Sequence, residues 1–255
     1  MLMRHRGESP CEHLEWDSRH FGLRIARVSA SALLDGHAAE IDDWRRQEQV
    51  DCLYLLAPLD HLPARRLAET LGFHLIDVRI TLERTTAGGQ PPTFAATRPF
   101  CDADLPRLVH LAGTLHRDSR FFVDTGFPEA RSRAMFERWM MRACSEPAYH
   151  VIVAEVDGGP AGYVACERKH DGSGQIQLVG VDVTAQRRGL ATQMLNDAMA
   201  HFARHGVSHV TVVTQATNLA ALRLYESLGF LTRAHDAWYH WWAQESSPAD
   251  GTLRP

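Results

Sequence analysis

The segment with the clearest chemical potential is "QRRGLA", Gln186 to Ala191, which follows an apolar run and precedes a helical pattern. In a strand-loop-helix arrangement, the backbone N–H groups of the loop and first helical turn have no intrahelical acceptor, and the helix dipole adds positive charge. Gly189 lets the backbone approach an anion because it has no Cβ, while Arg187 and Arg188 add local charge. The segment therefore predicts a pyrophosphate site, although taken alone its six residues are a weak signal.

A second candidate lies in "ALRLYESLGF", which nearly repeats an earlier segment, "ARRLAETLGF". The first copy has Ala68 where the second has Tyr225. On a helix, Asn218 and Tyr225 lie two turns apart on one face. Asn218 precedes an apolar run, as a helix N-cap does, and a tyrosine on an amphipathic helix is usually a packing residue. The repeat indicates two related units, of which only the second has the phenol and the glycine loop.

Helical and strand patterns alternate along both halves, which predicts an α/β protein with a mixed sheet. The first half predicts strands over 23–29, 52–58 and 73–83 and helices over 38–49 and 63–72. The second predicts strands over 95–100, 149–156, 161–168, 175–183, 207–215 and 237–242 and helices over 102–116, 129–144, 187–206 and 218–229. Gly-Gly and Pro-Pro mark a linker. The expected organisation is a first unit over 1–84 without a cofactor loop, a linker over 85–93, a catalytic unit over 94–243 and a flexible tail over 244–255.

Composition sets broad limits on the partners. The chain has 255 residues, a net charge of −4 and a pI near 6.4, so a polyanionic ligand must be met by a local basic site. No partner nucleic acid or membrane is expected. Its five cysteines are scattered without a CxxC pair, and no apolar run reaches the roughly 18 to 20 residues of a membrane span. A soluble, cytoplasmic protein is therefore expected.

Histidine is abundant, at 15 residues, and three of these residues invite a metal interpretation. His201 and His205 share a helical face, but no HExxH pattern or carboxylate partner accompanies them, and His209 falls in the next strand. A solvated helix face is the favoured interpretation, and no metal is expected.

Over roughly 97–242 the sequence resembles the GNAT superfamily of acetyl-CoA-dependent N-acetyltransferases. The resemblance rests on the ordered series "LVGVDV", "QRRGLA", "VTVVTQ" and "NLAALRLYESLGF". Two positions depart from the common pattern, Val183 for a frequent proline and Ala191 for a frequent glycine, and neither removes a backbone donor.

The resemblance implies acetyl-CoA as the cosubstrate and Tyr225 as the general acid for the departing thiolate. It also implies that the pantetheine arm pairs like an extra strand with Val181 and Val183. Gly180, inside that apolar strand, is typical of a bulge or close approach, and in this family a splayed strand there admits the thioester. The implied cofactor-binding residues are Val181, Asp182, Val183, Gln186, Arg187, Arg188, Gly189, Leu190, Ala191, Thr192 and Asn218.

The chain from Leu14 to Trp242 also resembles a narrower group, the dTDP-4-amino-4,6-dideoxyhexose N-acetyltransferases of the dTDP-fucosamine type. The supporting segments are "LEWDSRHFGLRIARV", "SRFFVDTGFP" with "FERWM", and "VTQATNLAALRLYESLGF". In "SRFF", Arg120 could bind a nucleotide diphosphate and Phe121 or Phe122 could pack on a base or sugar. A surface arginine and core phenylalanines are the equally weighted alternative. Trp16 and Phe21 are expected in the core.

The acceptor chemistry stays open at this level. No general base is evident; Glu155 on "VIVAEV" and a water-linked route are candidates, and Glu155 could equally lie on a solvent face. The favoured acceptor is the amine of a nucleotide sugar. Another amine, such as an antibiotic, amino acid or protein N-terminus, or a non-catalytic acyl-CoA-binding module remain alternatives. A homodimer also stays open.

Overall fold

The computed structural model describes residues 9–29, 32, 37–86 and 96–243. The chain divides into two compact units, residues 1–78 with 235–255 and residues 79–234. The division falls within strands β4 (His74–Thr85) and β10 (Leu231–Trp242), and it assigns the end of β10 to the first unit. Most of the expected linker at 85–93 and the expected tail at 244–255 lie outside the described residues.

Among its described residues, the first unit combines short strands with the three helices named below. β1 (Cys11–His13) pairs antiparallel with β2 (Ile25–Val28), β2 pairs parallel with β3 (Cys52–Pro58), and β3 pairs antiparallel with the end of β10. The helices are α1 (Glu15–Phe21), α3 (Ala38–Gln47) and α4 (Leu62–Thr70). Ala68 of α4 is completely buried among the apolar residues, aliphatic and aromatic, that form this core.

The segment around α1 was only partly predicted. Phe21 is buried, as expected, but the expectation that Trp16 is a core residue is wrong, because 45% of its surface is exposed. Trp16 lies near the start of this seven-residue helix and stacks on His20 instead, with the ring centroids 5.1 Å apart. The aromatic residue therefore covers its own helix.

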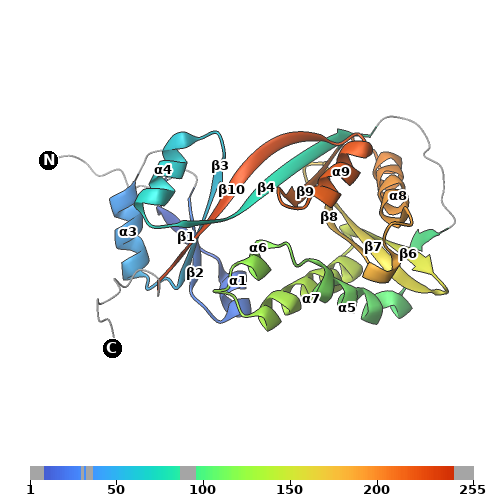
Figure 1. Cartoon of the computed structure of the whole chain (residues 1–255), viewed down its shortest axis with the longest axis horizontal. Helices are drawn as coiled ribbons and strands as arrows, with labels where there is room; N and C mark the ends of the chain where they lie inside the picture. Colours follow the sequence, from blue (N-terminus) through green and yellow to red (C-terminus); the bar gives the residue numbers. More distant parts are fainter. Residues whose placement is uncertain (1–8, 30–31, 33–36, 87–95, 244–255) are drawn as a thin grey trace, which may run out of the picture. The chain divides into compact units, whose positions relative to one another are not determined.

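The second unit is a sheet in the order β4-β9-β8-β7-β6-β5, covered by helices on both faces (Figure 1). Its strands, besides β4, are β5 (Thr97–Pro99), β6 (Tyr149–Val156), β7 (Gly159–Arg168), β8 (Gly174–Val181) and β9 (His209–Gln215). Its helices are η1 (Asp102–Asp104), α5 (Leu105–Leu115), α6 (Arg120–Val123), α7 (Glu129–Ser145), η2 (Val183–Ala185), α8 (Leu190–Arg204) and α9 (Leu219–Ser227). The mixed α/β class predicted from the sequence is thus confirmed.

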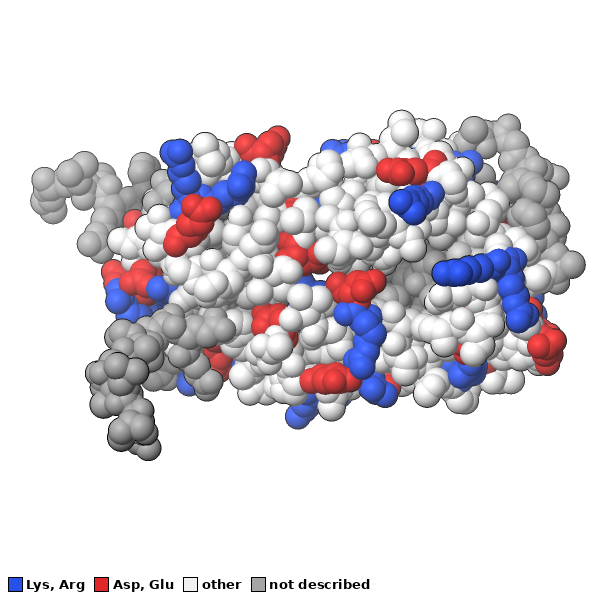
Figure 2. Space-filling model, viewed as in Figure 1, with Lys and Arg blue, Asp and Glu red and all other residues white. Residues whose placement is uncertain are grey.

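Helices α5 and α7 lie on one face of this sheet, and α8 and α9 lie on the other (Figure 1). All of its strand pairs are antiparallel except β8 with β9, which run parallel. None of the helices in the described part of the chain is both long and apolar enough to cross a bilayer. On the face drawn in Figure 2, basic and acidic side chains are interspersed, so any anion site there must be local.

Candidate active site

The glycine loop connects β8 to α8 through an unusual backbone path. Arg187 has φ 62° and Gly189 has φ 76°, both in the left-handed region. For a non-glycine residue such as Arg187 this conformation is uncommon and costs about 1 kcal/mol or more, so it is typical of a functional turn. The helix starts at Leu190, and within the described residues no side chain caps it. The N–H groups of the first turn are therefore available to a ligand.

Gly189 is needed mainly for its backbone conformation. A Cβ built on it would meet only the Gln193 side chain, at 3.8 Å, so the protein itself leaves room for a side chain. At φ 76°, however, a β-branched residue would be strained. The left-handed backbone at Gly189 is thus a second reason for glycine here, besides the close approach of a ligand.

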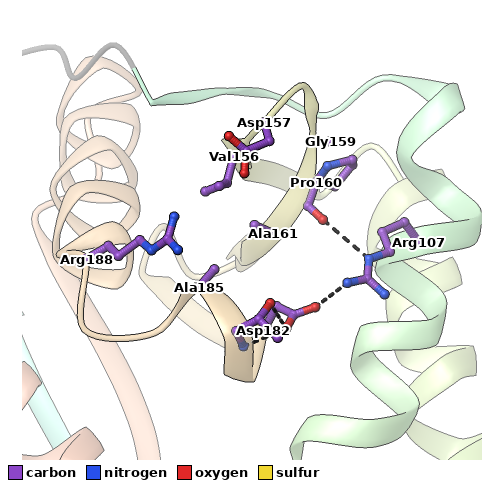
Figure 3. Close-up of a pocket in the computed structure, with 10 residues that line it drawn as sticks. Arg107, Val156, Asp157, Gly159, Pro160, Ala161, Asp182, Ala185 and Arg188 are labelled. Atoms are coloured by element: carbon purple, nitrogen blue, oxygen red, sulfur yellow. Dashed lines mark hydrogen bonds and ion pairs between the residues drawn. The ribbon is translucent and has the colours of Figure 1, made fainter.

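A pocket of about 480 Å³ adjoins the loop (Figure 3). Arg188 of the loop and Arg107 of α5 lie on opposite sides of it, with the turn between β6 and β7 above (Figure 3). Arg107 is ion-paired with Asp182 and donates to the Pro160 carbonyl at 3.4 Å. Arg188 has no ion-pair partner in the described part of the chain. Asp157 and Asp182 also line the pocket, so its two arginines are balanced in number by two aspartates, and Arg188 of the loop is the arginine without an ion pair among the described residues.

Asp182 is a structural residue of this turn. Its Oδ1 accepts hydrogen bonds from the Thr184 N–H at 2.9 Å and the Thr184 hydroxyl at 2.7 Å. These bonds, together with Arg107, lower the pKa of the carboxyl. The turn that Asp182 stabilises through its side chain follows β8 directly, so the strand ends at Val181. The predicted strand end at Val183 is therefore wrong by two residues, and Val183 lies in η2 with 71% of its surface exposed.

Strands β8 and β9 diverge before they end. Their parallel pairing covers only Gly174 to Ile176 opposite Val210 to Val212, although the strands continue to Val181 and Gln215. In the antiparallel pairing of β8 with β7, the register shifts between Leu178 and Ile176. Gln177 is therefore an extra, bulged residue of β8. Beyond it, the edge of β8 toward β9 has no strand partner in the described residues. An extended ligand with amide groups could pair there.

Gly180 lies on this unpaired stretch. A Cβ at Gly180 would be 2.6 Å from Tyr163 Cζ and 2.7 Å from its Oη, so no side chain fits. The predicted close approach at Gly180 is confirmed, with Tyr163 of β7 as the close neighbour. The bulge itself lies three residues earlier, at Gln177. The splayed strand that the resemblance implied is present.

Asn218 and Tyr225 lie on α9, which follows β9, the other strand at this gap. The Asn218 Oδ1 accepts from the Ala221 N–H at 3.1 Å, so the predicted N-cap is confirmed. Tyr225 is 5% exposed and packs edge-on against Phe230, with centroids 5.9 Å apart. Burial raises the pKa of its phenol. A neutral phenol, and hence a proton donor, is therefore present near pH 7.

The predicted acceptor residues differ in exposure. Phe121 is buried and packs against Phe127 and Trp139, which supports the core alternative for this residue. The Arg120 guanidinium carbon lies 4.0 Å from the Phe121 ring centroid, and both Arg120 and Phe122 are partly exposed. Only these last two could touch a ligand without repacking.

Glu155 does not lie at the gap. Its carboxylate is ion-paired with Arg98 at 2.7 Å, and the same guanidinium binds Asp104 at 2.7 Å. β6, which contains Glu155, is two strands from β8. This position favours a structural role for Glu155 rather than that of a base.

His116 and Tyr163 form a polar pair that the sequence did not reveal. His116 Nε2 lies 2.7 Å from Tyr163 Oη, and the imidazole stacks on Phe136. Burial lowers the pKa of His116 to about 4 and raises that of Tyr163. The two residues are 47 positions apart and belong to no spaced motif, so no local signal could have joined them.

The histidines of α8 also differ from expectation. His201 is 8% exposed and stacks on His150 of β6, with ring centroids 3.8 Å apart, so the expected solvated face is wrong for this residue. Burial lowers its pKa to about 3. His205 and His209 are exposed. Among the residues that the structure describes, no group of three or more His, Cys, Asp or Glu side chains could hold a metal ion.

Comparison with known proteins identifies the fold. Residues 114–230 match the model of the acetyltransferase (GNAT) family. The second unit has the GNAT acetyltransferase fold. A solved GCN5-related N-acetyltransferase from Sphaerobacter thermophilus matches 91% of this chain and 76% of its own, with a TM-score of 0.65 and 18% identity. The glycine loop, the splayed strands and Tyr225 all fall within the GNAT match.

Curated relatives are more distant. A mycothiol acetyltransferase from Mycolicibacterium gilvum is 26% identical over 66% of this chain and 56% of its own length. The spore coat polysaccharide biosynthesis protein SpsD of Bacillus subtilis is 23% identical over 78% of this chain and 69% of its own. The chain spans 23% to 59% of the first five mycothiol acetyltransferases that it matches.

Proposed function

We propose that the protein transfers an acetyl group from acetyl-CoA to an amine, and that the amine belongs to a nucleotide-linked amino sugar of the dTDP-4-amino-4,6-dideoxyhexose type. One observation carries the proposal: an unpaired edge of β8 runs directly into a glycine loop with open N–H groups. An extended chain with amides, ending in a diphosphate, fits both features, and CoA has that chemistry.

In this proposal the diphosphate binds the N–H groups from Gln186 to Thr192, with Arg187 and Arg188 contributing charge. The pantetheine amides pair with the open edge of β8 near Val181. They do not pair with Val183, because Val183 lies in η2, beyond the end of the strand. Asn218, whose side chain already caps α9, faces the arm from the β9 side. The thioester then lies near Gly180, where the strands are apart.

The chemistry is direct attack by the amine on the thioester. The nitrogen forms a bond to the acetyl carbon, the tetrahedral adduct collapses, and the C–S bond breaks. With reference pKa values of about 8.5 for a thiol and about 10 for a phenol, full proton transfer from the phenol to the thiolate is uphill by about 2 kcal/mol, and the raised pKa of the buried Tyr225 makes it less favourable still. Tyr225 thus acts mainly by hydrogen bonding as charge develops on sulfur.

The sugar nucleotide is supported by resemblance across both units and by the match to SpsD, whose printed name concerns a polysaccharide. Arg120, with Phe122 beside it, is the group proposed to meet the nucleotide diphosphate. The mycothiol acetyltransferase matches favour a second candidate, the acceptor amine of those enzymes.

An assay of thiol release with purified protein separates these candidates. The panel contains dTDP-amino sugars, UDP-amino sugars, the acceptor of the mycothiol acetyltransferases, aminoglycosides and peptides. Turnover is expected on a dTDP-amino sugar. Robust turnover on another amine, with none on any nucleotide sugar, would refute the proposed acceptor and leave acetyl transfer in place.

A further inference from the structure

The acceptor amine must lose a proton during attack, and the one base candidate on the sequence, Glu155, is held in an ion pair away from the gap. The His116–Tyr163 pair lies much closer. Tyr163 is paired with Gly180 across β7 and β8, and the ring atoms nearest to the missing Cβ are Cζ, Oη and Cε1. The hydroxyl end of the ring therefore lies over β8, the strand that borders the gap.

The glycine makes this reach possible. Adjacent strands are about 4.8 Å apart, and at Gly180 no side chain stands between the phenol of Tyr163 and the backbone of β8. Any Cβ at Gly180 would overlap the phenol. Tyr163 points to the sheet face that α5 and α7 cover, because its hydroxyl meets His116 at the end of α5.

The two members of the pair differ in accessibility. Tyr163 has 0% of its surface exposed, whereas His116 is partly exposed. The Tyr163 hydroxyl occupies His116 Nε2. Nδ1 has no hydrogen-bond partner among the described residues. It is also absent from the set of completely buried polar atoms without a partner, so this nitrogen is not completely buried. Nδ1 is therefore the nitrogen without a partner among the described residues, and it keeps some exposed surface.

Aromatic stacking fixes the orientation of the imidazole. The His116 ring stacks on Phe136 at 4.7 Å and 14°, and Phe136 stacks on Phe122 at 5.9 Å and 15°. Phe122 belongs to the segment proposed for acceptor binding. The pair thus lies between the acceptor segment and the gap of β8 and β9.

We propose that His116 accepts the proton that the attacking amine loses, and that Tyr163 is the positioning residue: its hydroxyl oxygen accepts from His116 Nε2–H, which leaves the lone pair of the neutral imidazole on Nδ1. The inference rests on the proposed acetyl transfer. When the N–C bond forms from the neutral amine, the nitrogen of the tetrahedral adduct carries a positive charge and the former carbonyl oxygen a negative one. The N–H proton moves to Nδ1, the nitrogen becomes neutral, and collapse of the oxyanion breaks the C–S bond. The imidazolium then returns its proton to solvent through the exposed part of the ring.

A low basicity of His116 suits this role. Burial keeps the imidazole neutral near pH 7, so the lone pair is available. Such a base cannot deprotonate a free ammonium efficiently, but the ammonium of a tetrahedral adduct is far more acidic.

The test compares His116→Ala with His110→Ala, an exposed histidine on the same helix. His116→Ala is expected to lower kcat about 100-fold with acetyl-CoA affinity by calorimetry within twofold of wild type, and added imidazole is expected to restore part of the rate. Tyr163→Phe is expected to lower kcat roughly tenfold without changing the acetyl-CoA KM. His110→Ala should behave as wild type.

Wild-type turnover by His116→Ala, or a loss that imidazole does not restore in a variant with an unchanged melting temperature, would overturn the inference while leaving acetyl transfer intact. If the wild-type protein acetylates no amine of the panel, the proposed function fails and the inference fails with it.

Discussion

The two repeat copies have the same local geometry but different contents. Helix α4 starts with the His61 side chain accepting from Ala64 N–H at 3.2 Å, and α9 starts with Asn218 accepting from Ala221 N–H at 3.1 Å. Both end in Leu-Gly-Phe with a left-handed glycine, φ 72° at Gly72 and 80° at Gly229.

The returning hydrogen bonds also match. Phe73 N–H donates to the Ala68 carbonyl at 2.9 Å, and Phe230 N–H donates to the Tyr225 carbonyl at 3.0 Å. At the one position that differs most, the first unit buries a methyl group and the second buries a phenol. The comparison shows that both copies share the helix and its caps, whereas the phenol that we propose as the proton donor occurs only in the second copy, next to the glycine loop.

The largest expected effect comes from making the second copy more like the first. Tyr225→Phe removes only the hydroxyl, and kcat should fall 10- to 1000-fold, about 1.4 to 4 kcal/mol, because the phenol acts on charge that develops in the transition state. Acetyl-CoA affinity should stay nearly unchanged. Steady-state kinetics with calorimetry measure both, and turnover within twofold of wild type would make Tyr225 a packing residue.

A smaller effect is expected at the loop that the first unit lacks. Gly189→Val should weaken acetyl-CoA binding at least tenfold, about 1.4 kcal/mol, because valine resists φ 76° and its side chain obstructs the phosphates. Gly172→Val, in the turn between β7 and β8 with φ 81°, is the matched control for backbone strain. Equal affinities of the two variants by calorimetry would refute the loop as the phosphate site.

The smallest functional effect is expected from making the first copy more like the second. Ala68→Tyr introduces a phenol at a position with no exposed surface, so the free energy of unfolding should fall by about 1 to 3 kcal/mol through overpacking. No second acetyl-CoA site should appear. Denaturant unfolding measures the loss; unchanged stability would mean that this core can open, contrary to the packing described.

Local patterns predicted much of this molecule. The N-cap at Asn218, the close approach at Gly180 and the α/β class follow from residue types and spacing, because caps, glycine positions and periodicity are local. The pairing of β10 with β3, the burial of His201 and the His116–Tyr163 pair depend on contacts between distant segments. Single-sequence patterns contain no information on such contacts.

The bulge at Gln177 is an intermediate case. Glycine at 180 indicated an irregularity in this strand, but its site depends on the register with β7. The same limit applies to Trp16, whose size suggested burial although a short surface helix carries it. The size of a side chain indicates how much apolar surface could be buried, but not whether its helix faces the core.

The number of acetyl-CoA molecules bound per chain tests the comparison most directly, because in the described part of the chain only the second unit combines the glycine loop with a splayed strand. Isothermal titration of the whole chain is expected to give one site, with Gly189→Val weakening that site. Two sites of similar affinity, or one site that Gly189→Val leaves unchanged, would contradict the account.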